Sequence, residues 1–160
     1  MTDYGRIFLA GLGSALLLIG ALGSQYLGGL APCPMCIWQR WPHLAAIALA
    51  VVAVTIGWRY RRALAGLGGL AALATAGIGL FHAGVEQKWW EGPSTCTAGD
   101  LTELTPSQAL DQLLNTSPVL CDEIVWQFGL TLAGWNAAIS AGLAALWFWT
   151  LWDPKAADPA

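Results

Sequence analysis

Charged residues are scarce in this chain of 160 residues. Lysine, arginine, aspartate and glutamate make up 11% of it, whereas about 25% is usual for a soluble domain. No charged residue separates Arg6 from Cys33, and the other long apolar stretches are interrupted at most by a single histidine. This shortage of charge excludes an ordinary soluble domain and indicates a protein that lies in a membrane.

Four apolar segments are long enough to cross a bilayer. A spanning helix needs roughly 20 residues to traverse about 30 Å of hydrocarbon. We therefore predict an all-α membrane protein, a four-transmembrane-helix bundle that forms a single domain over residues 1–160. The predicted spans cover residues 7–26, 37–57, 63–83 and 127–149. The first is too long for the apolar core of a cleaved signal peptide, so we expect it to be retained.

Positive charge is concentrated where the predicted spans end on one side. The basic residues at these positions are Arg6, Arg59, Arg61, Arg62 and Lys155. The positive-inside rule assigns that side to the cytoplasm. We therefore expect a multi-pass protein of a bacterial inner membrane with both termini in the cytoplasm. The loops at residues 27–36 and 86–123 would then lie in the periplasm, an oxidising compartment that permits disulfides.

Small and aromatic residues indicate how the helices pack. Rows of small residues at i, i+4 spacing let helix backbones approach closely in lipid. Two such rows predict packing seams: Gly68, Ala72 and Ala76 in the third span, and Ala133, Ala137, Ala141 and Ala145 in the fourth. Nearly all of the ten tryptophans, Trp147 among them, fall near predicted span ends and are interpreted as interfacial anchors. Trp135 lies deeper in the predicted span.

Cysteine is also rare, with four in the chain, and the first two form a C-x-x-C pair between two spans. Pro34 suits the first position of a helix, which makes Cys33 the N-cap and places Cys36 in the first turn. A helix N-terminus favours a thiolate. Arg40 shares a helix face with Cys36 at i+4, and an arginine there needs a partner or a function. It would stabilise a Cys36 thiolate and the developing oxyanion of a bound electron acceptor.

The other two cysteines, Cys96 and Cys121, lie in the long outer loop. A purely structural disulfide between them would stabilise the fold by around 3 kcal/mol. Because a second thiol pair lies on the same side, a dithiol relay carried by a mobile loop is the better interpretation. Between them, a capping pattern that begins at Thr105 predicts a short amphipathic surface helix ending before Pro118. A helix packed on a partner protein and a flexible loop remain alternatives.

These features resemble a known family, the bacterial membrane oxidases called DsbB. The specific part is the run from Cys33 to Arg40, Cys-Pro-Met-Cys-Ile-Trp-Gln-Arg, which looks like the family's C-x-x-C followed by an arginine four positions on. Cys96 and Cys121 match the family's second pair. The resemblance covers four spans, a short first outer loop and a long second one.

The resemblance implies a relay that ends in quinone reduction. A periplasmic DsbA-like thioredoxin-fold protein would attack the Cys96–Cys121 disulfide, with Cys96 forming the mixed disulfide. Cys121 would then exchange with Cys33, and Cys36 would pass electrons to membrane ubiquinone or menaquinone beside Arg40. The activity implied is that of a protein-dithiol:quinone oxidoreductase that sustains disulfide bond formation.

His82 lies roughly where the family has a histidine. It would either contact a quinone carbonyl or form an interfacial pair with Glu86 at i+4. Neither Gln39, His43 nor Glu86 receives a functional assignment from the sequence.

Other interpretations explain fewer of these features. The vitamin K epoxide reductase group also joins four helices to two thiol pairs, but there the loop pair precedes the membrane pair. A non-enzymatic membrane scaffold with a disulfide-braced outer loop leaves the C-x-x-C and Arg40 unexplained. A zinc or copper site is disfavoured because the second pair is widely spaced and has no histidine beside it. The spans also lack the acidic residues and broken helices of a transporter. We expect no metal and no nucleic-acid partner.

Overall fold

The computed structural model describes residues 2–55, 58–96, 105–107, 120–124 and 127–152 of the chain. Four long helices account for most of these residues: α1 (Asp3–Tyr26), α2 (Pro34–Thr55), α3 (Arg61–Glu86) and α5 (Leu132–Trp152). Each is long and apolar enough to cross a membrane. The predicted four-helix membrane bundle is thus confirmed.

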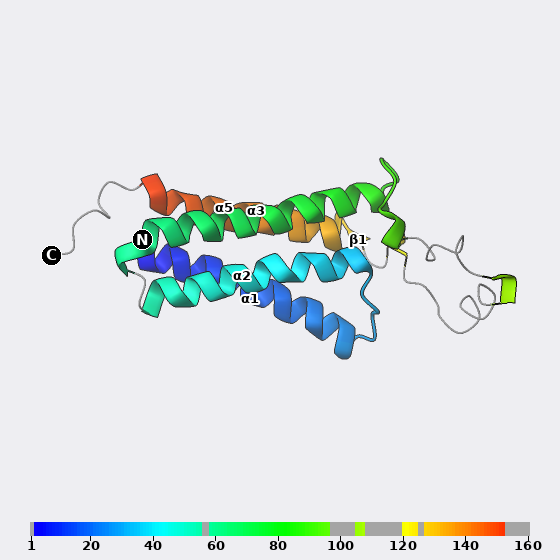
Figure 1. The fold of residues 1–160 in the computed structure, drawn as a ribbon, viewed down its shortest axis with the longest axis horizontal. Coiled ribbons are helices and arrows are strands. Elements are labelled where there is room, and N and C mark those ends of the chain that lie inside the picture. The colour runs from blue at the N-terminus through cyan, green and yellow to red at the C-terminus, as the bar shows by residue number, and fades with distance from the viewer. Residues whose placement is uncertain (1, 56–57, 97–104, 108–119, 125–126, 153–160) are drawn as a thin grey trace.

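The helices form a closed bundle in which α1 and α3 each pack against both α2 and α5. The short 3-10 helix η1 (Trp58–Tyr60) joins α2 to α3 at the end where α1 begins and α5 finishes (Figure 1). At this end the Asp3 carboxylate lies 3.2 Å from the Arg6 guanidinium and 3.4 Å from that of Arg61. At the opposite end α1 and α3 finish and α2 and α5 begin. The cysteines and the clustered arginines are therefore separated by the length of the bundle.

The beginning of α2 agrees with the sequence-based expectation. Pro34 is its first residue, and the Cys36 backbone N–H donates to the Cys33 sulfur at 3.2 Å. Cys33 therefore serves as the side-chain cap of the helix, and Cys36 lies in its first turn. This cap fixes the spacing of the two sulfur atoms.

The fourth helix begins five residues later than the span predicted over 127–149. Strands β1 (Gln127–Phe128) and β2 (Leu130–Thr131) form a small antiparallel hairpin in front of it. Gly129 turns this hairpin with a φ of 70°, a conformation that glycine adopts without strain. The helix then starts at a cap, because the Gly134 backbone N–H donates to the Thr131 hydroxyl at 3.1 Å. As a result Trp135 lies in the first turn of α5, not deep in the span.

The packing seam between α3 and α5 was predicted correctly on α3 and only partly on α5. Gly68, Ala72 and Ala76 are all buried on α3, but Ala141 and Ala145 are exposed. Four residues of an α-helix turn the chain about 40° past a full circle, so a long i, i+4 row drifts off the contact face. The buried face of α5 instead alternates steps of four and three: Ala133, Ala137, Ser140, Ala144 and Trp147.

Trp147 belongs to the core of the bundle and is not an interfacial anchor. Its side chain is fully buried, and it packs against Gly68 so closely that a Cβ atom there would lie 2.6 Å from the indole ring. Small residues on α3 thus make room for an aromatic side chain on α5. This packing holds the half of the bundle distant from the cysteines.

The predicted surface helix of the outer loop lies largely outside the described residues. Thr105, Pro106 and Ser107 are described, and the latter two are helical. The rest of the predicted helix remains a prediction.

Candidate functional site

All four cysteines meet at one end of the bundle. Cys33, Cys96 and Cys121 are buried in one cluster with Met35 and Val85, and Cys36 packs against it. Cys96 and Cys121 form a disulfide, whereas Cys33 and Cys36 are free thiols. The sulfur atoms of this free pair lie 2.7 Å apart, close enough to form a disulfide with little rearrangement. The structure therefore brings a disulfide and a dithiol together in one buried site.

The chain folds back sharply after α3, which returns the outer loop to the bundle. The Trp90 indole packs directly over Gly84, where a side chain would clash, and donates to the Phe81 carbonyl at 2.9 Å. The short 3-10 helix η2 (Ser94–Cys96) follows. The Cys121 backbone N–H then donates to the Cys96 carbonyl at 3.4 Å, so the second pair docks on the first.

Cys33 is the less acidic member of its pair. Its hydrogen bond with Cys36 and its burial both raise the pKa of the Cys33 thiol well above its usual range. A thiol rather than a thiolate is therefore the stable form of Cys33 while both cysteines are reduced. Reactions that release Cys33 as a thiolate need help from a neighbouring group.

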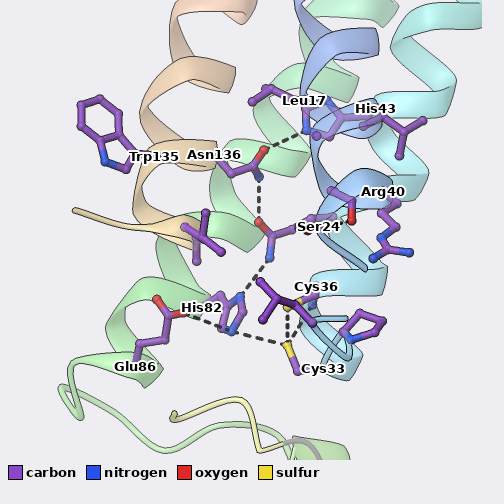
Figure 2. A pocket seen from close by; sticks show the side chains of 18 of the residues that line it. Leu17, Ser24, Cys33, Cys36, Arg40, His43, His82, Glu86, Trp135 and Asn136 are labelled. Carbon is purple, nitrogen blue, oxygen red and sulfur yellow. Dashed lines mark hydrogen bonds and ion pairs between the residues drawn. The ribbon is translucent and has the colours of Figure 1, made fainter. Parts of the chain in front are cut away.

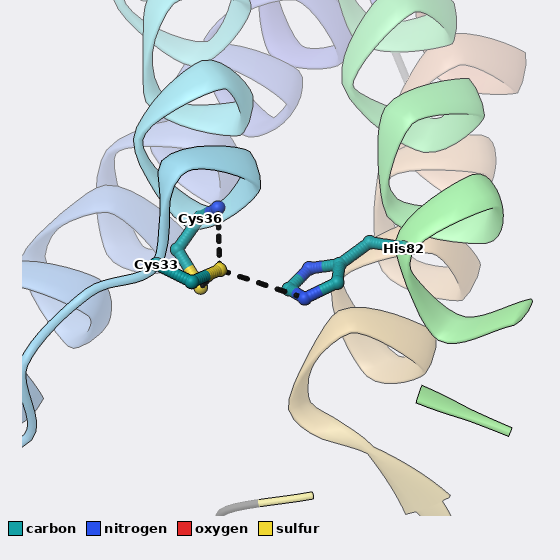
Figure 3. A group of neighbouring side chains, drawn as sticks. All are labelled: Cys33, Cys36 and His82. Carbon is teal, nitrogen blue, oxygen red and sulfur yellow. Dashed lines mark hydrogen bonds between the residues drawn. The ribbon is translucent and has the colours of Figure 1, made fainter. Parts of the chain in front are cut away.

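His82 lies beside the free cysteines and comes from α3 (Figure 3). Its Nε2 atom lies 3.6 Å from the Cys33 sulfur and 3.9 Å from a carboxylate oxygen of Glu86. The histidine is 4% exposed, so it is a buried residue, although the expected i+4 pair with Glu86 is present. Potential ligand atoms of Cys33, Cys36 and His82 all lie within 4.8 Å of one another. The absence of a metal remains a prediction.

A cavity of about 380 Å³ opens beside Cys36. Aliphatic side chains of α1 form much of its wall, including Leu16 and Leu17, while polar side chains reach it from α2, α3 and α5 (Figure 2). A volume of this size, with few polar groups on an apolar wall, is typical of small-molecule sites.

Arg40 is on the wall of this cavity, as its spacing from Cys36 predicts. Its Nη1 atom donates to the Gln25 side-chain oxygen at 2.7 Å. Its Nε atom is buried without a hydrogen-bond partner among the described residues. A buried cationic donor without a partner is costly.

Sequence reasoning missed a polar network that continues inward from His82. Gln39, Thr75, His43 and Asn136 are joined to it by hydrogen bonds across α2, α3 and α5, and His43 and Asn136 are labelled in Figure 2. Polar side chains inside a membrane span face a bundle interior and tend to be functional. That signal was present at Asn136 and Thr75, but the sequence could not show that they meet.

Comparison with known proteins decides the family. The family model for disulfide bond formation protein DsbB matches residues 5–150. The chain belongs to the DsbB family. Several relatives are named disulfide bond formation protein B. The one from Stutzerimonas stutzeri is 30% identical, and the alignment spans 89% of this chain and 91% of the relative. The one from Marinobacter nauticus is 32% identical over 89% of this chain and 86% of the relative, and the one from a Shewanella species is 36% identical over 84% of this chain and 79% of the relative. No solved structure is significantly similar to the chain.

Membership of the DsbB family gives the chain a general role. The chain is a disulfide bond formation protein with an oxidoreductase function. Its four membrane-spanning helices fit a multi-pass protein of the inner membrane.

Proposed function

We propose that this chain reoxidises a periplasmic DsbA-like dithiol protein and passes the electrons through its two cysteine pairs to membrane quinone. The observation that carries the proposal is the burial of both pairs in one cluster beside a cavity that Arg40 lines. In this view Cys33, Cys36, Cys96 and Cys121 are catalytic, and Arg40 and His82 line the cavity that would take the quinone.

The first exchange takes place at the outer pair. A thiolate of the partner attacks Cys96, the Cys96–Cys121 bond breaks, and Cys121 leaves as a thiolate. The partner's second thiolate then attacks its own sulfur in the mixed disulfide and releases Cys96. The partner has lost two electrons and gained a disulfide, while the outer pair of this chain is reduced.

The second exchange returns the outer pair to its disulfide. The Cys121 thiolate attacks Cys33 of an oxidised Cys33–Cys36 pair, and Cys36 leaves as a thiolate. Cys96 then attacks Cys121, which re-forms the outer disulfide and releases Cys33 as a thiolate. The result is an oxidised outer pair and a reduced inner pair, which is the covalent state of the structure. Cys33 suits the role of attacked sulfur because it shares the buried cluster with Cys121.

The cavity beside Cys36 suits a quinone ring. Arg40 would place a cation beside a carbonyl oxygen of the ring, and aliphatic side chains of α1 would cover the ring. A bound ubiquinone or menaquinone supplies an acceptor for the two electrons and two protons that the Cys33–Cys36 dithiol loses when it becomes a disulfide. Arg40 and Cys36 line the same cavity, so the cation also favours a thiolate at Cys36.

The charge distribution supports an orientation in the membrane. The end of the bundle that carries Arg6 and Arg61 would face the cytoplasm, and the cysteine cluster would face the periplasm. A periplasmic dithiol protein and a quinone in the lipid would then both reach the same end of the bundle.

The purified protein, a reduced DsbA-like protein and a short-chain quinone test the proposal. We expect two protein thiols to be lost for each quinone reduced, and each of Cys33→Ala, Cys36→Ala, Cys96→Ala and Cys121→Ala to abolish turnover. Ser140→Ala, a buried change on α5 outside the cavity, is the control and should turn over normally. Full turnover by any one cysteine variant would refute the four-cysteine relay. No thiol exchange with the outer disulfide would favour a disulfide-braced scaffold.

A further inference from the structure

The orientation of the Gln39 side-chain amide is fixed by the protein backbone. Its nitrogen lies 3.1 Å from the Met35 carbonyl oxygen, which can only accept a hydrogen bond. The reverse orientation would place two oxygen atoms against each other. The amide oxygen of Gln39 accordingly faces the Asn136 side-chain nitrogen at 2.7 Å.

The orientation of the Asn136 side-chain amide follows from the same argument. Its nitrogen donates to Gln39, and to Thr75 Oγ1 at 3.3 Å. Its oxygen therefore faces His43 Nε2 at 2.9 Å and accepts from it. The Thr75 hydroxyl donates to the Gln39 backbone carbonyl at 3.2 Å, which further ties α3 to α2 at this level. Each side-chain amide thus has its donor and acceptor assigned by its neighbours.

This chain of assignments determines which nitrogen of His82 carries the proton. The Gln39 nitrogen lies 3.0 Å from His82 Nδ1, and because an amide nitrogen only donates, Nδ1 must accept. A neutral imidazole that accepts at Nδ1 carries its hydrogen at Nε2. The groups around Nε2 agree, since the Cys33 sulfur and a Glu86 carboxylate oxygen face it at 3.6 and 3.9 Å.

We propose that Gln39 is a positioning residue that holds His82 as the Nε2–H tautomer, with that hydrogen directed at the Cys33 sulfur. The catalytic meaning rests on the proposed function, in which Cys33 leaves as a thiolate when Cys96 attacks Cys121. A hydrogen bond from His82 to the departing sulfur stabilises its developing charge and speeds its departure. His82 acts there as a donor and not as a base, because Nε2 already holds its hydrogen. No proton changes place in this step.

The tautomer can be measured directly, because the chain contains only two histidines. Nitrogen NMR of the detergent-solubilised reduced protein, labelled at histidine, separates protonated from bare ring nitrogens. The His82 signals are those missing from His82→Asn. We expect a bare Nδ1 and a protonated Nε2 for neutral His82. A neutral His82 that is protonated at Nδ1 in the unmodified protein would overturn the proposal, whatever the behaviour of any variant.

Two variants extend this measurement. Gln39→Glu replaces the donor with an acceptor and should place a proton on His82 Nδ1, whereas Gln39→Met should leave the two tautomers mixed. Gln25→Met is the matched control, because it removes a glutamine that contacts Arg40 and should not alter the His82 spectrum. An unchanged His82 spectrum in Gln39→Glu would also overturn the proposal.

Kinetics separate this proposal from the proposed function. Re-formation of the outer disulfide, followed by rapid mixing with quinone absent, should slow about tenfold in Gln39→Glu, in which the hydrogen moves to Nδ1, the loss expected for one hydrogen bond to a charged sulfur. The unmodified rate in Gln39→Glu would remove Gln39 from the positioning role while leaving the relay intact. No exchange between the pairs in the unmodified protein would refute the relay, and the NMR result would still stand by itself.

Discussion

Replacing Asn136 with leucine should destabilise the bundle by an amount that the structure allows us to work out. The change removes three hydrogen bonds between helices, to Gln39, Thr75 and His43. Hydrogen bonds between helices inside a membrane contribute about 0.6 kcal/mol each on average. We therefore expect the free energy of unfolding to fall by about 2 kcal/mol, less than the loss of three bonds in a water-excluded soluble core.

Unfolding in mixed micelles of a mild detergent and SDS, followed by tryptophan fluorescence, measures this loss. Ser140→Ala is the matched control, because Ser140 is fully buried on the same helix and its hydroxyl has no partner among the described residues. Its removal should leave stability unchanged or slightly raised. If the two variants unfold within about 0.5 kcal/mol of each other, the network does not stabilise the bundle and the reasoning is refuted.

Three further predictions follow from the packing and the site. Gly68→Ala should cost about 1–3 kcal/mol because its Cβ would meet the Trp147 indole. Gly77→Ala, which has open space, should instead stabilise α3 by up to about 1 kcal/mol in the same assay. Arg40→Gln should raise the apparent KM for quinone about tenfold while the helix content stays unchanged. The distant variant Arg62→Gln is the control and should leave the KM unchanged, and an unchanged KM in Arg40→Gln would remove Arg40 from the site. Since the pKa of Cys33 is raised, its alkylation in the reduced protein should be slow at neutral pH and accelerate only under alkaline conditions. Site-resolved mass spectrometry checks this, and the rate of an ordinary free cysteine at neutral pH would contradict it.

Local signals in the sequence predicted local structure well. Proline after Cys33 identified both the cap and the first turn of α2, because proline at a helix start needs no long-range partner. Hydropathy identified all four spans, because the apolar character of a span is also a local property of the sequence. It misplaced the start of α5, since the apolar residues after Gln127 look alike whether they form a strand or a helix. The Thr131 cap and the turn at Gly129 decided the matter.

What the sequence could not predict depends on residues brought together by folding. Gln39 and Asn136 are far apart along the chain, and their contact fixes the orientation of the Asn136 side-chain amide, which the sequence alone does not indicate. The drift of the α5 seam away from Ala141 follows from helix geometry that a simple i, i+4 rule ignores. The docking of the outer disulfide on Cys33 likewise needs the sharp return of the chain over Gly84.

The burial of the outer disulfide has a consequence for timing. Cys96 and Cys121 are 5% and 1% exposed, and a thiolate can break a disulfide only by reaching one of its sulfur atoms directly. Under the proposed relay, a soluble partner protein would therefore react only after the disulfide has moved away from Cys33 and Met35. Each turnover would then include an opening step, and the fraction of time spent open would set an upper limit on the rate at which the partner is oxidised.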